Sequence, residues 1–184
     1  MQPAERRRFT YQEYAKLPEG ADFQLIDGEI VMTPSPGTVH QEVQARLGFL
    51  LQQFLQTTNW GKLFYAPTDV YFTEHDTFQP DILIVSKARF DIIKEQRIED
   101  APDLVVEILS PSTGYYDLAQ KKRVYESFGV SEYWIVDPME KTVDIFENGE
   151  NGFGLVSQAR RSGRVSSSLL QDFSVDAEKL FEGL

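Results

Sequence analysis

The order of hydrophobic and polar positions predicts two long helices and two buried strands. Apolar residues recur at helical spacing over 39–56, and a second helix is predicted over 117–128, where Gly129 follows in the position of a helix C-cap. Two runs rich in Ile, Val and Leu, at 81–85 and 104–109, are typical of buried strands. The apolar stripe of the first helix consists of Val43, Leu47, Leu50, Leu51, Phe54 and Leu55. These elements predict a sheet with helices packed on it.

Turn and capping signals indicate shorter elements. Thr10, with Glu13 three residues later, forms a capping box that predicts a short helix over 10–17. The Asp27-Gly28 pair predicts a tight turn between two strands over 23–32. Further short strands are predicted over 63–65, 70–72, 133–136 and 143–146. The complete order predicts the α/β (α+β) fold class.

Length and composition narrow the class of protein. A chain of 184 residues suits one domain, and the aromatic content of 12% supplies enough apolar surface for a core. The absence of cysteine excludes disulfides and thiolate zinc sites. No apolar stretch approaches the ~20 residues of a membrane helix, and the N-terminal residues lack the apolar segment of a signal peptide. We therefore expect a cytoplasmic protein with no membrane partner.

The net charge of −11 weighs against a polyanionic partner, because binding to phosphates needs clustered Lys and Arg. Charge runs of the kind that this chain contains usually lie on the solvated surface. The basic clusters are Arg6-Arg7-Arg8, Lys121-Lys122-Arg123, and Arg160-Arg161 with Arg164. Charge alone thus leaves the partner open.

Two carboxylates lie on apolar strands, where an unpaired charge would be costly. Asp81 opens the strand 81–85, and Glu107 lies inside 104–109, on the same face as Val105. Asp81 could simply cap a strand, and Glu107 could belong to a buried ion pair. Taken together on two adjacent strands, they favour a site for a hard cation such as Mg²⁺ or Mn²⁺.

Both helices add a polar residue to their buried faces. At 100° per residue, Lys121 falls near the middle of the apolar stripe of the second helix, where its ammonium needs a partner or must extend to water. His40 falls at the start of the buried face of the first helix. It could be a satisfied core or capping residue, or it could orient a water or a phosphate.

Four segments together resemble the Uma-type family of restriction endonucleases, which belongs to the PD-(D/E)XK nuclease superfamily. The resemblance extends from about residue 11 to residue 146. The segments are Leu25-Ile26-Asp27-Gly28-Glu29, Gln79-Pro80-Asp81, Ala101-Pro102-Asp103-Leu104-Val105-Val106-Glu107-Ile108-Leu109-Ser110-Pro111-Ser112-Thr113 and Gly129-Val130-Ser131-Glu132-Tyr133-Trp134-Ile135-Val136-Asp137-Pro138. The resemblance implies a restriction-endonuclease-like fold, with a mixed central sheet flanked by helices. It also implies a division of the single domain into a helix and hairpin extension (1–36), a nuclease core (37–146) and a C-terminal extension (147–184).

The resemblance also implies the chemistry, which is hydrolysis of DNA phosphodiester bonds by Mg²⁺-activated water. Asp81, Glu107 and the Ile108 carbonyl would hold Mg²⁺ or Mn²⁺. The superfamily's usual lysine position, two residues after Glu107, is occupied by Leu109, and Lys121 on the following helix matches the displaced lysine. Lys121 would orient the water or stabilise the developing charge, His40 would contact the substrate phosphate, and DNA would be bound by a homodimer.

Two other functions remain open from the sequence. A catalytically degenerate nuclease-like fold, used for binding or assembly, would suit both the net charge of −11 and Leu109 at the usual lysine position. A metal-dependent hydrolase of small phosphoesters would also suit the acidity. Metal titration separates the first function from a nuclease, and comparison of DNA with a generic phosphodiester separates the second.

Overall fold

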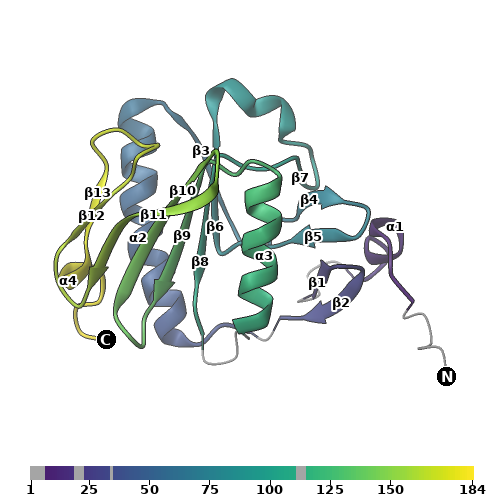
Figure 1. Ribbon diagram of the computed structural model, residues 1–184, viewed down its shortest axis with the longest axis horizontal. Helices are drawn as coiled ribbons and strands as arrows, with labels where there is room; N and C mark the ends of the chain where they lie inside the picture. The colour runs from purple at the N-terminus through teal and green to yellow at the C-terminus, as the bar shows by residue number, and fades with distance from the viewer. Residues whose placement is uncertain (1–6, 19–22, 34, 111–114) are drawn as a thin grey trace.

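A six-stranded mixed sheet forms the centre of the computed structural model, which describes residues 7–18, 23–33, 35–110 and 115–184, apart from the side chains of 115–117. Its strands, in spatial order, are β11 (Gly152–Arg160), β10 (Thr142–Gly149), β9 (Glu132–Asp137), β8 (Leu104–Ile108), β6 (Ile82–Ser86) and β3 (Gly61–Tyr65). The β8–β9 pair is parallel and the other pairs are antiparallel. This confirms the predicted mixed sheet and the strands near 63, 81, 104, 133 and 143 (Figure 1).

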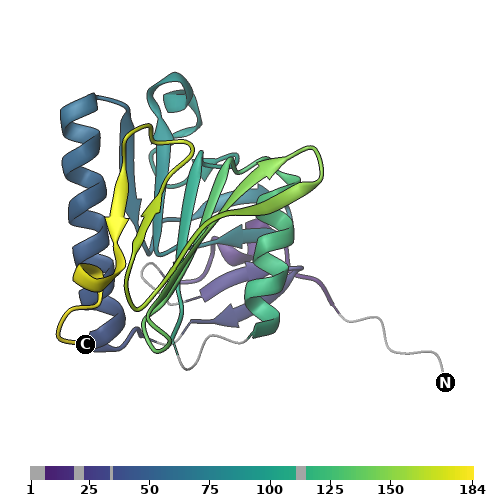
Figure 2. The same cartoon turned by 60° about the vertical axis from the view of Figure 1, so that its left-hand side comes forward.

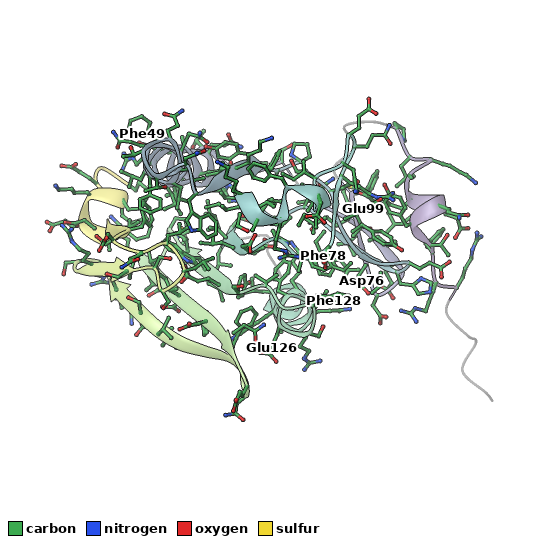
Figure 3. The ribbon with its side chains drawn as sticks, turned by 90° about the horizontal axis from the view of Figure 1, so that it is seen from above. Phe49, Asp76, Phe78, Glu99, Glu126 and Phe128 are labelled. Carbon is green, nitrogen blue, oxygen red and sulfur yellow. The ribbon has the colours of Figure 1, made fainter. Side chains whose placement is uncertain are left out.

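Helices cover both faces of this sheet. The long helix α2 (Thr38–Thr58) lies on one face and α3 (Tyr115–Ser127) on the other, as Figure 2 shows. Hydrophobic burial fixes α2, because its residues at helical spacing that face the sheet are at most 3% exposed: Val43, Leu47, Leu51 and Leu55. The prediction that Leu50 belongs to the buried stripe is wrong. Leu50 is 36% exposed, because it lies about 100° from Leu51 around the helix. Phe49, beside it, points outward from α2 (Figure 3).

The second predicted helix ends slightly earlier than expected. Helix α3 stops at Ser127, and Gly129 adopts a positive φ of 81°, which a C-terminal glycine provides without a Cβ penalty. Phe128, the last residue of the predicted helix, lies outside α3 and is 39% exposed, because the chain leaves the helix before it. Its ring still packs against Phe72, with centroids 5.5 Å apart.

The N-terminal hairpin belongs to a second sheet. Strands β1 (Phe23–Ile26) and β2 (Glu29–Met32) pair around Asp27 and Gly28, whose φ angles of 50° and 75° match the predicted tight turn. The five strands are ordered β2, β1, β5 (Asp76–Phe78), β4 (Val70–Thr73) and β7 (Ile98–Glu99). The hairpin and β4 were expected from the sequence, but β5 and β7 were not. The short helix α1 (Tyr11–Tyr14) follows its N-cap Thr10, whose N–H donates to the Glu13 carboxylate at 3.0 Å, as the capping box predicts.

The C-terminal residues add a β-ribbon and a short helix that the sequence did not reveal. Strands β12 (Arg164–Ser166) and β13 (Ser174–Asp176) pair with each other, and α4 (Ala177–Leu180) packs near α2. One buried carboxylate fastens this segment: Glu132 accepts hydrogen bonds from Trp134 Nε1, Ser167 Oγ and the main-chain N–H groups of Ser168 and Leu169. Within the described ranges, no helix is both long and apolar enough to cross a membrane.

Candidate active site

The candidate site forms where strands β6 and β8 meet the beginnings of two helices. The strands are antiparallel, with Ile82 opposite Val106, so continuing the register by one residue places Asp81 opposite Glu107. Glu107 shares the face of Val105, which belongs to the apolar core beneath α3. The predicted orientation of Glu107 is therefore confirmed, and α2 and α3 both begin at this end of the sheet (Figure 1).

Asp81 is held through both carboxylate oxygens. Its Oδ2 accepts a hydrogen bond from the Ile108 main-chain N–H at 2.6 Å, and its Oδ1 lies 3.1 Å from His40 Nε2. Gln44, one turn further along α2, donates to the Asp81 main-chain oxygen at 2.7 Å. These contacts fix both the strand start and its carboxylate against α2 and β8.

Glu107 is nearly as buried as its apolar neighbours, with a side chain 8% exposed. Lys121, itself 5% exposed, places Nζ 3.2 Å from Glu107 Oε1 and 3.3 Å from Oε2. Tyr125, one turn later on α3, donates to Oε1 at 2.6 Å. The partner that Lys121 needs is thus Glu107, with which it forms a buried ion pair. Helix α3 supplies two donors, Lys121 and Tyr125, to this one carboxylate.

Burial and the neighbouring charges shift the pKa values of Glu107, His40 and Tyr125. Burial raises the pKa of Glu107 above its ordinary value, Lys121 opposes that shift, and the nearby charge of Asp81 adds to it. Burial lowers the pKa of His40, but the hydrogen bond and charge of Asp81, with smaller contributions from Glu107 and the Ile108 main chain, outweigh it and leave that pKa raised. Desolvation raises the pKa of the Tyr125 hydroxyl, and the Glu107 charge raises it further, so this hydroxyl remains a donor.

The structure places the residues that the sequence proposed for the site in two contacting pairs, His40 with Asp81 and Lys121 with Glu107. The Ile108 N–H, next to Glu107 in the chain, donates to Asp81, and the Asp81 charge raises the pKa of Glu107, so the two pairs lie near each other. His40 is 7% exposed, and its Nδ1 has no hydrogen-bond partner among the described residues. The catalytic and metal-binding roles of these residues stay predictions.

Two supporting residues were missed by the sequence reasoning. Tyr125 lies four residues after Lys121, and Gln44 lies four residues after His40, so each is the next residue on the same helix face. Helical spacing puts Tyr125 on the buried face of its helix together with Lys121, and Gln44 on the face of His40, but assigns neither residue a contact. The hydroxyl and amide contacts themselves depend on three-dimensional packing.

The donor set fits a hard divalent cation. Mg²⁺ is typically held by one or two carboxylates, with water and substrate oxygens completing its coordination, and Asp81, Glu107 and the Ile108 carbonyl offer oxygen ligands. Across the described ranges, no three His, Asp or Glu side chains are grouped so as to hold a metal ion. A metal here would therefore rely on two carboxylates and main-chain oxygen rather than on a side-chain cage.

The family model Uma2, described as "Putative restriction endonuclease", matches residues 11–178. The chain belongs to the Uma2 family. This Uma2 protein is 26% identical over 166 residues to the protein slr1290 of Synechocystis sp., covering 88% of this chain and 84% of the relative. The identification agrees with the sequence resemblance.

A solved structure supports the fold. A protein of Anabaena variabilis, titled a "putative nuclease belonging to DUF820", has a TM-score of 0.79 and 22% sequence identity, and the match covers 94% of this chain and 97% of that one. At this identity the likeness establishes the nuclease-like fold of the Uma2 protein.

Proposed function

We propose that this Uma2 protein is a metal-dependent endonuclease that hydrolyses phosphodiester bonds in DNA. The observation that supports the proposal is that Lys121 of α3 pairs with Glu107 of β8, and that the register of β6 and β8 continues to Asp81 opposite Glu107. The family description of a restriction endonuclease gives this arrangement its reaction class. The family is thus the reason to favour a phosphodiester over other substrates that a metal site could accept.

In the proposed reaction, Asp81, Glu107 and the Ile108 carbonyl would hold Mg²⁺ or Mn²⁺. The chemistry that such an ion would supply is polarisation of the phosphate and a lowered pKa of the attacking water. Lys121 stabilises the negative charge that develops on the phosphate, or orients the attacking water. The Ile108 N–H and His40 keep the Asp81 carboxylate in place at 2.6 and 3.1 Å, so the metal-binding oxygens need little reorganisation.

His40 contacts the substrate phosphate in this proposal. Its Nε2 is occupied by Asp81, whereas Nδ1 has no hydrogen-bond partner among the described residues and is buried. A buried polar atom without a partner is costly, and a ligand that supplies one removes that cost. Contact with a phosphate oxygen would use the protonated imidazole, which the raised pKa of His40 favours.

The position of Lys121 on α3 bears on the absence of the superfamily's usual lysine at position 109, where this chain has Leu109. In this chain the ammonium reaches the Glu107 carboxylate from α3 rather than from strand β8, so a lysine is present at the site although Leu109 occupies its usual position. The same ion pair also suits the alternative, a degenerate module in which Glu107 and Lys121 merely satisfy one another. Metal binding is the property that separates these two functions.

The charge on the protein surface contributes little to DNA binding. We therefore propose that DNA binding depends on the metal site and on formation of a homodimer. Several residues of the basic clusters are paired with acidic residues: Arg7 with Glu13, Arg8 with Asp27, Lys121 with Glu107, and Arg160 with Glu140. Cleavage of both strands further favours a homodimer, because one site acts on one strand.

The test compares wild type with Asp81→Asn, Glu107→Gln and the control Glu42→Gln, whose side chain is 50% exposed on α2. Mn²⁺ binding is measured by calorimetry, and Mg²⁺-dependent cleavage is measured on plasmid DNA and on bis(p-nitrophenyl) phosphate. We expect Mn²⁺ binding and plasmid cleavage in wild type and in the control, and strongly weakened Mn²⁺ binding with loss of plasmid cleavage in the two site variants.

Other outcomes select the alternatives. A wild-type protein that does not bind Mn²⁺ would be a binding or assembly module. Cleavage of the small diester without cleavage of DNA would identify a phosphoester hydrolase. Light scattering at micromolar concentration tests the dimer, and the 21.1 kDa monomer mass would contradict it.

A further inference from the structure

The two carboxylate oxygens of Glu107 accept hydrogen bonds from different numbers of described donors. An ionised carboxylate offers about two acceptor positions on each oxygen. Oε1 receives the Tyr125 hydroxyl at 2.6 Å and the Lys121 ammonium at 3.2 Å, whereas Oε2 receives only Lys121, at 3.3 Å, among the described residues. The remaining acceptor position therefore lies on Oε2.

Tyr125 is held more rigidly than the lysine beside it. The Tyr125 side chain is fully buried, and its ring lies 5.7 Å from the rings of Phe72 and Phe78 and 5.3 Å from that of Tyr133. Figure 3 places Phe78 and Phe128 beside α3, where this aromatic cluster packs. A planar ring in contact on several sides leaves its hydroxyl one direction, whereas a lysine has a flexible four-carbon stem.

The two donors therefore differ in what they can do during a reaction. Lys121 is the proposed partner of the substrate, so its ammonium must be able to leave Glu107 or share it with a phosphate. If Lys121 alone oriented Glu107, the carboxylate would lose its orientation whenever substrate engaged the ammonium. The Tyr125 hydroxyl stays on Oε1 in either state, since it reaches no other described carboxylate.

We propose that Tyr125 is a positioning residue, which holds Glu107 Oε1 and so presents Oε2 to the divalent metal while Lys121 acts on the substrate. The inference rests on the proposed function, because it assumes that Glu107 is a metal ligand. Tyr125 touches neither metal nor substrate and acts only through Glu107. Partners of this kind, which orient a ligand, typically change metal affinity by about 10- to 100-fold when they are removed.

Removal of one hydroxyl tests the proposal. Tyr125→Phe keeps the ring in its cluster and deletes only the hydrogen bond to Glu107. We expect its Mn²⁺ dissociation constant, measured by calorimetry, to rise about 10- to 100-fold. The matched control is Tyr14→Phe, because the Tyr14 hydroxyl also lies 2.9 Å from a carboxylate oxygen, that of Asp69, in the N-terminal part of the chain. The control should lose stability without any change in Mn²⁺ affinity.

A double variant distinguishes positioning from general destabilisation. If Tyr125 acts through Glu107, adding Tyr125→Phe to Glu107→Gln should leave the remaining Mn²⁺ affinity within about twofold of the single Glu107 variant. Tyr125→Met, which also lacks the hydroxyl, replaces the Phe variant if that variant shows no cooperative thermal transition. Folding of each variant is checked by its melting curve before titration.

The outcomes separate this inference from the proposed function. If Glu107→Gln strongly weakens Mn²⁺ binding but Tyr125→Phe binds as tightly as wild type, Tyr125 has a purely structural role and the inference is overturned alone. If Glu107→Gln binds Mn²⁺ as well as wild type, or if wild type binds none, Glu107 is not a ligand, and the metal site and the role of Tyr125 are overturned together.

Discussion

The buried Glu107–Lys121 pair gives the sharpest prediction about stability. Replacing either partner leaves the other charge in a nearly dry environment, where the two side chains are only 8% and 5% exposed. Replacing both removes that problem. We therefore expect Glu107→Gln and Lys121→Met each to destabilise the metal-free protein, and the double variant to be less destabilised than the sum of the two.

The distance sets the size of the effect. Two unit charges 3.2 Å apart attract by about 5 kcal/mol at an effective dielectric constant of ~20. In the Glu107→Gln variant the side-chain amide oxygen would still accept from Tyr125, and in the Lys121→Met variant Glu107 can take up a proton, so part of this energy is retained in each single variant. We expect single costs of roughly 2–3 kcal/mol and a coupling energy of about 1–3 kcal/mol.

Thermal unfolding in metal-free buffer measures all four proteins. For a chain of 184 residues, a loss of 1 kcal/mol lowers Tm by about 2–4 °C, so each single variant should melt roughly 4–12 °C below wild type. Burial already raises the pKa of Glu107. The loss of stability in Lys121→Met should therefore grow as pH rises, because the Glu107 carboxylate must then ionise without its partner. Additivity within about 0.5 kcal/mol at neutral pH would refute the reasoning, because it would mean that the pair contributes no interaction energy.

The geometry supports three further predictions. Because the pKa of His40 is raised in the folded protein, protonated His40 stabilises the fold fully below the ordinary histidine pKa, and this stabilisation is lost as pH rises through the pKa of the folded protein. In Asp81→Asn the pKa of His40, followed by proton NMR without metal, should fall below its wild-type value. Glu132→Gln should cost about 2–4 kcal/mol and increase amide exchange over residues 167–169 while Mn²⁺ affinity is unchanged, whereas unaltered exchange there would contradict its role in fastening this segment. Gly28→Ala should lower Tm, because φ is +75° and a Cβ would lie 2.7 Å from Arg8 Cβ; an equal or higher Tm would show that the turn can relax.

Local signals explain why the sequence predicted much of the fold. The Asp27-Gly28 pair fixes a turn by its own backbone preferences, and the stripe through Val43 and Leu47 is repeated over a helix of 21 residues. The five-stranded sheet could not be predicted in the same way, since β5 and β7 contain three and two residues and carry no periodicity. Their place depends on pairings across the chain, such as Leu25 with Thr77.

The site was predictable for a related reason. Glu107 on an apolar strand and Lys121 on an apolar helix face are each costly alone, and this cost indicates that they meet. The sequence could not show how the charges are balanced. Two carboxylates considered without their donors predict that Glu107→Gln relieves repulsion and stabilises the protein, whereas the contacts of Lys121 and Tyr125 predict the opposite.

The balance of charge at the site connects the acidity of the chain to its proposed substrate. Without metal, Asp81 and Glu107 contribute two negative charges and Lys121 one positive charge, which Glu107 already engages. A phosphate approaching this cluster would meet net negative charge on a protein whose total is −11, unless His40 is protonated. A divalent cation would reverse the sign at the site and release part of the Lys121 charge for the phosphate. The same arrangement would therefore make DNA binding, and not only cleavage, depend on the metal, because the paired arginines at the surface supply little attraction of their own.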